Sequence, residues 1–238
     1  MMNELQHAPE RATEHACRIE RLQSLMSQEG IDLMLVTQNV DIYYFTGSMQ
    51  TGYLAVPQSG QPVYYVRRSM TRAMEESAVP VQPLGSLRTL GERLSREFAL
   101  AASGGAKRLV FAAEYDVLPA QLATRLREAI PYADWVDGSA VIREARMIKS
   151  AYELERIRQA ARVVDDALRE AIGYIREGMP EYELIARIEF ALRMRGHLGV
   201  MRMRGYNQEI VTGVVGAGEA VARPTYFDGP GGGSGLSA

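Results

Sequence analysis

The sequence predicts an α/β protein that is built in two parts. As far as about residue 142, short apolar runs typical of buried strands alternate with stretches in which apolar residues recur every three or four positions. From about Ala151 this alternation gives way to one amphipathic helix of about six turns. We therefore expect an α/β domain over residues 17–142, followed over residues 143–238 by a second domain that opens with this helix.

The first domain is expected to follow a flexible arm at residues 1–16 and to open with a helix. The helix repeats apolar residues at three- and four-residue spacing as far as Gly30, a common helix stop. These residues are Ile19, Leu22, Leu25 and Met26.

Short apolar runs separated by glycine and proline predict the strands of this domain. The first, Ile31–Val36, is almost continuously apolar, as expected of a strand buried on both faces. Two helices, Leu87–Leu100 and Leu118–Ile130, are expected on either side of a later strand. The further strand candidates are Ile42–Phe45, Tyr53–Val56, Val63–Val66, Arg108–Ala112 and Trp135–Val136.

The second domain is expected to contain two helices and at least one strand. Gly178 ends the long helix, and Pro180 opens a shorter helix that closes at Gly196. Glu209–Val215 is a strand candidate. The glycine-rich run at residues 229–235 fits either a native flexible loop or an engineered linker.

Composition argues against several classes of protein. With 27 Lys and Arg against 29 Asp and Glu, the net charge is −2, so no overall field recruits nucleic acid or an anionic membrane. No apolar run approaches the roughly 20 residues that cross a bilayer, and the N-terminus lacks the apolar core of a signal peptide. The single Cys17 excludes an internal disulfide. We expect a cytoplasmic protein that binds neither nucleic acid nor membranes.

Few residues suggest a catalytic or metal-binding site. The three histidines, His7, His15 and His197, are far apart, and no HExxH motif or Cys/His cluster is present, so a common zinc site cannot be assembled. His197 follows Gly196 and is interpreted as a capping or surface residue. Cys17 is interpreted as an inert thiol.

Charged and aromatic pairs also have structural interpretations. The acidic pairs Asp165–Asp166 and Glu153/Glu155 lie near arginines on the long helix and are expected to form solvated ion pairs. Tyr43–Phe45 and Tyr64–Tyr65 are expected to fill a core rather than to stack on bases. The basic cluster of Arg143, Arg146 and Lys149 is expected at a domain interface or in solvent, in preference to anion binding.

Several short motifs occur in an order that resembles a known family. Gly30–Asp32 reads GID, and Asn39–Gly47 approximates N-x-x-Y-x-T-G with one extra residue. Arg146–Ile157 follows the order R-x-x-K…E-x-x-x-I, and Gly178–Glu181 stands at a G-x-[ST]-E position. This succession resembles the creatinase/aminopeptidase P family of Xaa-Pro peptidase-like metallohydrolases. The resemblance implies a creatinase-like N-terminal α/β domain, followed by the incomplete first half of an α+β pita-bread catalytic domain that is truncated at residue 238.

The resemblance also implies a chemistry. Family members use two divalent ions, such as Mn²⁺, Co²⁺ or Zn²⁺, to activate a bridging water for attack on a peptide or another small amide substrate. The family's two Asp, one His and two Glu ligands would lie beyond Ala238, so no metal ligand or catalytic residue is assignable here. We expect this chain alone to be inactive and its full-length parent to form a homodimer.

One stretch departs from the family pattern. Family peptidases commonly carry G-x-N-x-x-x-P-H, whose histidine reaches the substrate and assists proton transfer. In Gly218–Thr225, Ala220 replaces the asparagine and Thr225 replaces the histidine. Thr225 is therefore the candidate substrate-binding residue. It favours, as an alternative, a creatinase-like or lyase reaction on the same fold; a metal-free pita-bread binding module is a third possibility.

Overall fold

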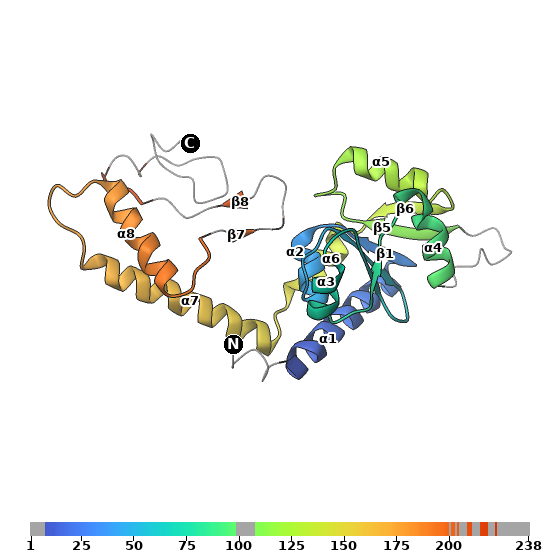
Figure 1. Cartoon of the computed structure of the whole chain (residues 1–238), viewed down its shortest axis with the longest axis horizontal. Coiled ribbons are helices and arrows are strands. Elements are labelled where there is room, and N and C mark those ends of the chain that lie inside the picture. The colour runs from blue at the N-terminus through green and yellow to red at the C-terminus, as the bar shows by residue number, and fades with distance from the viewer. Residues whose placement is uncertain are drawn as a thin grey trace. The chain divides into compact units, whose positions relative to one another are not determined.

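The helices and strands of the protein belong to two compact units (Figure 1). The first unit contains the chain as far as Ile148 together with Arg204, and the second contains it from Lys149 onward apart from the short stretch at Arg204. The computed structural model describes residues 8–98, 108–199, 201–202, 204, 209–210, 215–218 and 222.

A six-stranded mixed sheet forms the centre of the first unit, in the order β4-β3-β2-β1-β5-β6. β1 is antiparallel to β2 and parallel to β5, and β5 is parallel to β6. In this register Leu33 lies opposite Pro57 on one side and opposite Phe111 on the other. The strands are β1 (Leu33–Val36), β2 (Gly52–Pro57), β3 (Val63–Val66), β4 (Val81–Pro83), β5 (Leu109–Ala113) and β6 (Ala133–Asp137).

Helices cover both faces of this sheet (Figure 1). Apolar side chains of α1, α2, α3 and α6 contribute to the core on one face, and those of α4 and α5 contribute to the core on the other. The predicted α/β class is therefore confirmed. The helices are α1 (Ala8–Gln28), α2 (Asn39–Thr46), α3 (Met70–Glu76), a 3₁₀ turn (Leu87–Thr89), α4 (Leu90–Glu97), α5 (Ala120–Ala129) and α6 (Ser139–Met147).

The apolar run of β1 is continuous because the strand serves both cores. Met34 and Val36 point into one core, whereas Leu33 and Leu35 point into the other. Successive side chains of a strand lie on opposite faces, so a strand covered on both faces needs apolar residues at every position. This strand was predicted from the sequence and is confirmed.

One predicted strand, Ile42–Phe45, is a helix instead. The side chain of Gln38 accepts a hydrogen bond from the backbone N–H of Val40 and caps the start of α2. Gly47 ends the helix with φ 79° and donates its N–H to the carbonyl of Tyr43. A run of four apolar residues fits a strand or a buried helix equally well, and here the two caps decide.

The structure also contains helices and a strand that the sequence pattern did not predict. α1 begins at Ala8, so residues 8–16, which were expected to belong to a flexible arm, are helical. α3, β4 and α6 were not predicted. α6 follows β6 directly and buries Val141, Ile142 and Ala145 against the sheet.

The described part of the second unit contains a helical hairpin and two short strands. α7 (Ala151–Ile172) begins with a capping box, in which Ser150 and Glu153 bond each other's backbone N–H groups. It packs on α8 (Glu181–Met194), and small residues, Ala167, Ala171 and Ala191, are buried on the two helices. β7 (Met201–Arg202) pairs antiparallel with β8 (Glu209–Ile210).

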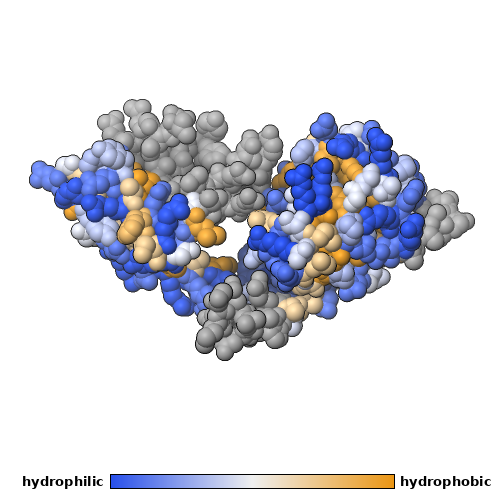
Figure 2. All heavy atoms as spheres, viewed as in Figure 1, coloured by the Kyte–Doolittle hydropathy of each residue, from blue (hydrophilic) through white to orange (hydrophobic). Residues whose placement is uncertain are grey.

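Many larger apolar side chains of α7 and α8 are exposed, and apolar residues are visible at the surface of this unit (Figure 2). Along α7 they include Ile157, Leu168 and Ile172. Both buried hydrophobic clusters of the described residues belong to the first unit. None of the helices in the described parts of the chain is both long and apolar enough to cross a membrane.

Candidate functional site

A group of buried charged side chains lies at one edge of the sheet in the first unit. β1 and β5 are parallel neighbours, so their carboxyl ends share this edge. From β1 the chain enters α2 on one face of the sheet, and from β5 it enters α5 on the other face. Ligands of open α/β sheets bind at such a point, where the connections diverge from two neighbouring strands.

Glu114, which directly follows β5, occupies this point with its own carboxyl group. Its side chain is fully buried. Oε2 accepts hydrogen bonds from the backbone N–H of Thr37 at 2.6 Å and of Gln38 at 2.9 Å, and lies 3.2 Å from the Thr37 hydroxyl. Two successive backbone N–H groups at the end of a strand are a common cradle for an anion. Here the group bound by the two N–H groups is the carboxyl group of Glu114, a side chain of the protein itself.

The second oxygen of Glu114 meets other charged groups. Oε1 is buried and accepts no hydrogen bond from the described residues; Nη2 of Arg204 lies 3.8 Å away. Burial, followed by the hydrogen bond and the charge of Asp41, raises the pKa of Glu114 to about 8, although the N–H groups of Thr37 and Gln38 oppose this change. When Glu114 is protonated, its hydroxyl group can donate a hydrogen bond to Asp41, which gives the second oxygen a partner.

Asp41 lies on α2 with no exposed surface and is held by two arginines. Arg146 of α6 donates from Nη1 to Oδ1, and Arg204 donates from Nε to Oδ2 at 2.7 Å. Each guanidinium group offsets part of the cost of burying this side chain away from water.

Asp116 completes the cluster. Arg204 binds it with two parallel hydrogen bonds, from Nη1 to Oδ2 at 2.5 Å and from Nη2 to Oδ1 at 2.8 Å. Arg143 of α6 also donates to Oδ2, at 2.5 Å. Burial acts to raise the pKa of Asp116, but the hydrogen bonds from Arg204 and Ser139 and the charges of the two arginines outweigh burial and lower the pKa.

These residues form a network of three acids and three arginines rather than a metal centre. Within the parts of the chain that the structure describes, no three His, Cys, Asp or Glu side chains are arranged to hold a metal ion. Asp41 and Asp116 each use both oxygens for guanidinium groups. The described residues therefore do not fit a dinuclear metal site, and the chemistry that the cluster supports is recognition of guanidinium groups.

The interpretation of the basic cluster at the link between the domains needs a correction. Arg146 was expected at a domain interface or in solvent, but its side chain is only 27% exposed and pairs with buried Asp41 inside the first unit. Arg143 pairs with Asp116, but its side chain is 55% exposed, in agreement with a position in solvent. The acidic partners were missed. Their position in the sequence could have identified them. Glu114 and Asp116 come directly after an apolar strand, and functional side chains of α/β sheets often lie just beyond the ends of such strands.

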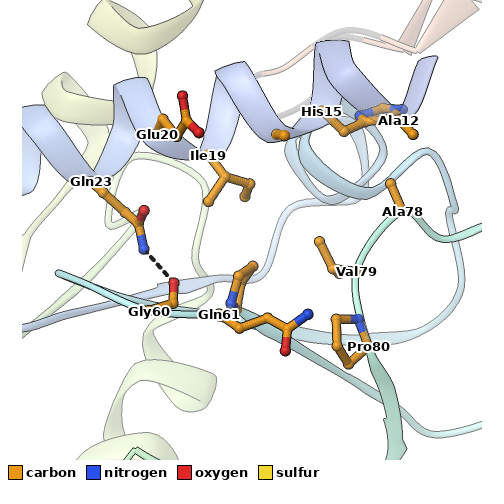
Figure 3. A pocket seen from close by; sticks show the side chains of 12 residues that line it. Ala12, His15, Ile19, Glu20, Gln23, Gly60, Gln61, Ala78, Val79 and Pro80 are labelled. Atoms are coloured by element: carbon orange, nitrogen blue, oxygen red, sulfur yellow. Dashed lines mark hydrogen bonds between the residues drawn. The ribbon is translucent and has the colours of Figure 1, made fainter. Parts of the chain in front are cut away.

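A shallow pocket on the same unit is the second candidate (Figure 3). It has a volume of about 260 Å³ and lies between α1, the turn at Gly60 and the loop before β4. Gln23 reaches across it and donates to the carbonyl of Gly60 at 2.8 Å. His15, only 8% exposed, lies with Nδ1 3.1 Å from the carbonyl oxygen of Tyr44. His15 and Glu20 are the only ionisable residues in its lining, so the pocket offers little chemistry.

The other residues marked in the sequence lie apart from the cluster. Exposed pairs join Asp165 to Arg169 at 3.4 Å and Glu155 to Arg162 at 3.6 Å, which confirms their interpretation as solvated ion pairs. Glu153 differs, because its carboxylate caps α7. The thiol of Cys17 is exposed.

The remaining candidates have mixed outcomes. The Nδ1 atom of His197 accepts a hydrogen bond from the backbone N–H of Gly199 at 2.9 Å in the turn after α8, in agreement with a local capping role. Tyr64 and Tyr65 are buried in the two cores as expected, but Tyr43 on α2 is 51% exposed, so the core interpretation is wrong for that residue. His7 and Thr225 lie outside the described residues.

Two protein-family models match the sequence. Residues 18–148 match the Creatinase/Prolidase N-terminal domain, and residues 155–232 match Metallopeptidase family M24. The chain is 27% identical over 181 residues to the Xaa-Pro dipeptidase of Pyrococcus furiosus and 28% identical over 179 residues to an uncharacterized peptidase of Bacillus subtilis. Each match covers 75% of this chain and 49% of the relative, so the chain spans about half the length of these relatives.

Solved structures show the same likeness. The prolidase from Pyrococcus furiosus matches with a TM-score of 0.62 and 27% identity, over 74% of this chain and 52% of that one. The prolidase from Pyrococcus horikoshii matches with a TM-score of 0.62 and 25% identity, over 75% of this chain and 49% of that one. The first family model matches more than half of the sequence, and the chain therefore belongs to the creatinase/prolidase N-terminal domain family, as its motifs indicated.

Proposed function

We propose that the full-length parent of this chain is a metallopeptidase-like hydrolase that acts on Xaa-Pro dipeptides or related small amides. The observation that carries the proposal is the succession of two family matches in one chain, the creatinase/prolidase N-terminal domain at residues 18–148 and family M24 at residues 155–232. Relatives named as Xaa-Pro dipeptidases share 26–27% of residues with the matched region, which favours peptide hydrolysis over the creatinase-like, lyase and binding-module alternatives.

In this proposal the chain supplies an N-terminal domain at residues 17–142 and the first part of a catalytic domain at residues 143–238. The parent would use divalent metal ions, Mn²⁺, Co²⁺ or Zn²⁺, which supply an activated water and stabilise the oxyanion. On the family resemblance we expect the ligands beyond Ala238, and we assign no step of the reaction to Asp41, Glu114 or Asp116. A cytoplasmic homodimer is part of the same proposal.

Thr225 would then lie beside the substrate, at the position of the family's histidine. A hydroxyl can donate a hydrogen bond to a substrate, but it cannot accept and return a proton near neutral pH. The parent should therefore bind Xaa-Pro dipeptides and turn them over slowly, unless another residue transfers the proton.

The test is an assay of the purified full-length parent with Ala-Pro and Ala-Ala dipeptides, before and after chelation and re-addition of Mn²⁺, Co²⁺ or Zn²⁺. We expect hydrolysis of Ala-Pro that disappears with chelator and returns with one of the metals. Equal hydrolysis of both dipeptides would contradict the Xaa-Pro preference. Activity that survives complete chelation would contradict the metallohydrolase class itself.

A further inference from the structure

The guanidinium group of Arg204 is the centre of the buried acidic cluster. Its side chain is 11% exposed, and it directs Nε to Asp41 and both Nη atoms to Asp116. Nη2 also lies 3.8 Å from the unpaired Oε1 of Glu114. The three nitrogens of one planar group thus lie against three acidic residues, an arrangement that the compact ammonium group of lysine cannot reproduce.

Contacts other than those to Arg204 also hold each acidic residue. Asp41 bonds Arg146, Asp116 bonds Arg143, and Glu114 bonds the backbone N–H groups at the end of β1. The carboxyl groups are therefore oriented by α2, α6 and the ends of two strands before Arg204 is considered. A site whose groups are held in place in advance binds its ligand without the cost of ordering them.

Arg204 comes from a distant part of the sequence. It lies 163 residues from Asp41 and 88 residues from Asp116, whereas the acidic residues and their other partners all fall within the first 148 residues. The acidic residues thus form a binding site within the first 148 residues, and the side chain of Arg204 binds there as a ligand would. The position agrees with this, because the ends of β1 and β5 form the point at which α/β sheets bind ligands.

We infer that Asp41, Glu114 and Asp116 form a guanidinium-binding site in the first unit, and that Arg204 is its resident ligand. The site recognises an arginine side chain through a two-pronged contact with Asp116 and a third contact with Asp41. It fastens the chain at Arg204 to the first unit. This assignment does not depend on the proposed hydrolase activity, since no substrate or metal ion takes part in it.

The inference predicts that a small guanidinium compound can replace the missing side chain in Arg204→Ala. Methylguanidinium should bind this variant at least about tenfold more tightly than it binds the wild type, where Arg204 fills the site. It should also raise the melting temperature of the variant toward the wild-type value. Methylammonium at the same concentration should do neither, because it lacks the planar fork.

Two further variants make the test specific. Arg195→Ala removes an arginine that pairs with Glu170 at 2.5 Å on the second unit, and we expect no rescue by methylguanidinium. Arg204→Lys keeps the positive charge but loses the planar set of guanidinium N–H donors, and we expect this variant to remain less stable than the wild type. Equal effects of methylguanidinium on wild type, Arg204→Ala and Arg195→Ala would overturn the inference, as would an Arg204→Ala variant that matches the wild type in stability and binds no methylguanidinium.

If Arg204→Ala does not fold, the wild type still decides the question. NMR of arginine side chains should then show an Arg204 Nε–H that exchanges with water at least about tenfold more slowly than exposed arginines, because it donates to buried Asp41. Asp116→Asn should remove much of this protection by breaking the two-pronged contact. Exchange of the Arg204 Nε–H at the rate of free arginine would overturn the inference.

Discussion

Arg146 at the end of α6 forms an ion pair with Asp41 on α2, across 105 residues of sequence, and Asp41 has no exposed surface. The pair ties the last helix of the first unit to the helix that follows its first strand. Only the short connection from Ile148 to Ser150 then separates α6 from the start of α7. The pair therefore fixes the point at which the chain leaves the first unit.

Removing the guanidinium of Arg146 should destabilise the first unit. Arg146→Met keeps most of the aliphatic volume but removes one of the two guanidinium groups that bind buried Asp41. Loss of one partner of a buried ion pair costs about 3 kcal/mol. Urea denaturation of both proteins measures the difference in the free energy of unfolding. The matched control is Arg169→Met, whose partner Asp165 is exposed, for which we expect a loss of less than about 0.5 kcal/mol. Equal decreases in the free energy of unfolding in the two variants would show that the buried ion pair stabilises the protein no more than the exposed one.

The buried carboxyl of Glu114 should make stability depend on pH. Burial and the neighbouring Asp41 raise its pKa from 4.5 to about 8 in the folded protein, against the effect of the N–H groups of Thr37 and Gln38, and Arg204 lies 3.8 Å away. The folded state therefore binds more protons than the unfolded state between these two values. Its contribution to stability is fully present below about pH 4.5 and is lost as the pH rises through about 8.

The measurement is the urea midpoint of wild type and Glu114→Gln at intervals from pH 5 to pH 9. We expect the wild-type midpoint to decline across this range and the midpoint of the variant, which cannot titrate at this position, to decline less. Asp116 has the opposite sign: its pKa is lowered, so its contribution is present above its unfolded pKa of about 3.8 and is lost in acid, outside this range. Parallel curves for the two proteins would contradict a raised pKa of Glu114.

The turn at the end of α2 should tolerate no side chain at Gly47. Its φ is 79°, and a Cβ there would lie 3.0 Å from Nε2 of His15 and 3.2 Å from the carbonyl oxygen of Glu76. Gly47→Ala should cost about 2–3 kcal/mol, the sum of backbone strain and crowding. Gly60, with φ 95° and no atom within 4 Å of such a Cβ, is the matched control. Gly60→Ala should cost only the backbone strain, about 1 kcal/mol, and equal costs at the two positions in urea denaturation would show that His15 and Glu76 give way without penalty.

The contrast between β1 and α2 shows what the sequence can predict. The run Ile31–Val36 predicts a strand that is covered on both faces, and the structure has this strand at Leu33–Val36. Ile42–Phe45 was assigned to the wrong structure, because a four-residue apolar run carries no period and the deciding caps at Gln38 and Gly47 lie outside it.

The candidate site was harder to predict than the fold. Asp41, Glu114 and Arg204 meet only because β1 and β5 are neighbours in the sheet and because the chain returns to the first unit at Arg204. Strand order and such returns are long-range properties, and no local spacing encodes them. The basic cluster of Arg143, Arg146 and Lys149 was visible in the sequence, but its acidic partners could be identified only from the folded chain.

Thr225 offers a test of the proposed reaction in the full-length parent. A positioned general acid or base contributes about 10²–10⁴-fold to the rate, so restoring the family's histidine with Thr225→His should raise kcat/KM for Xaa-Pro dipeptides within that range. Thr225→Val, which removes the hydroxyl at nearly constant volume, is the control and should lower kcat/KM through a higher KM. A wild type as fast as ordinary family peptidases, with no gain from the histidine, would show that Thr225 does not occupy the histidine position.

We propose that this chain carries the N-terminal part of a dinuclear metallohydrolase whose metal ligands lie beyond Ala238. Calorimetric titration with Mn²⁺ of this chain and of its full-length parent, in one buffer, tests it most directly. We expect about two tight sites per protomer in the parent and no stoichiometric site in the chain alone. One or two tight sites in the chain alone, accompanied by hydrolysis of Xaa-Pro dipeptides, would contradict the account.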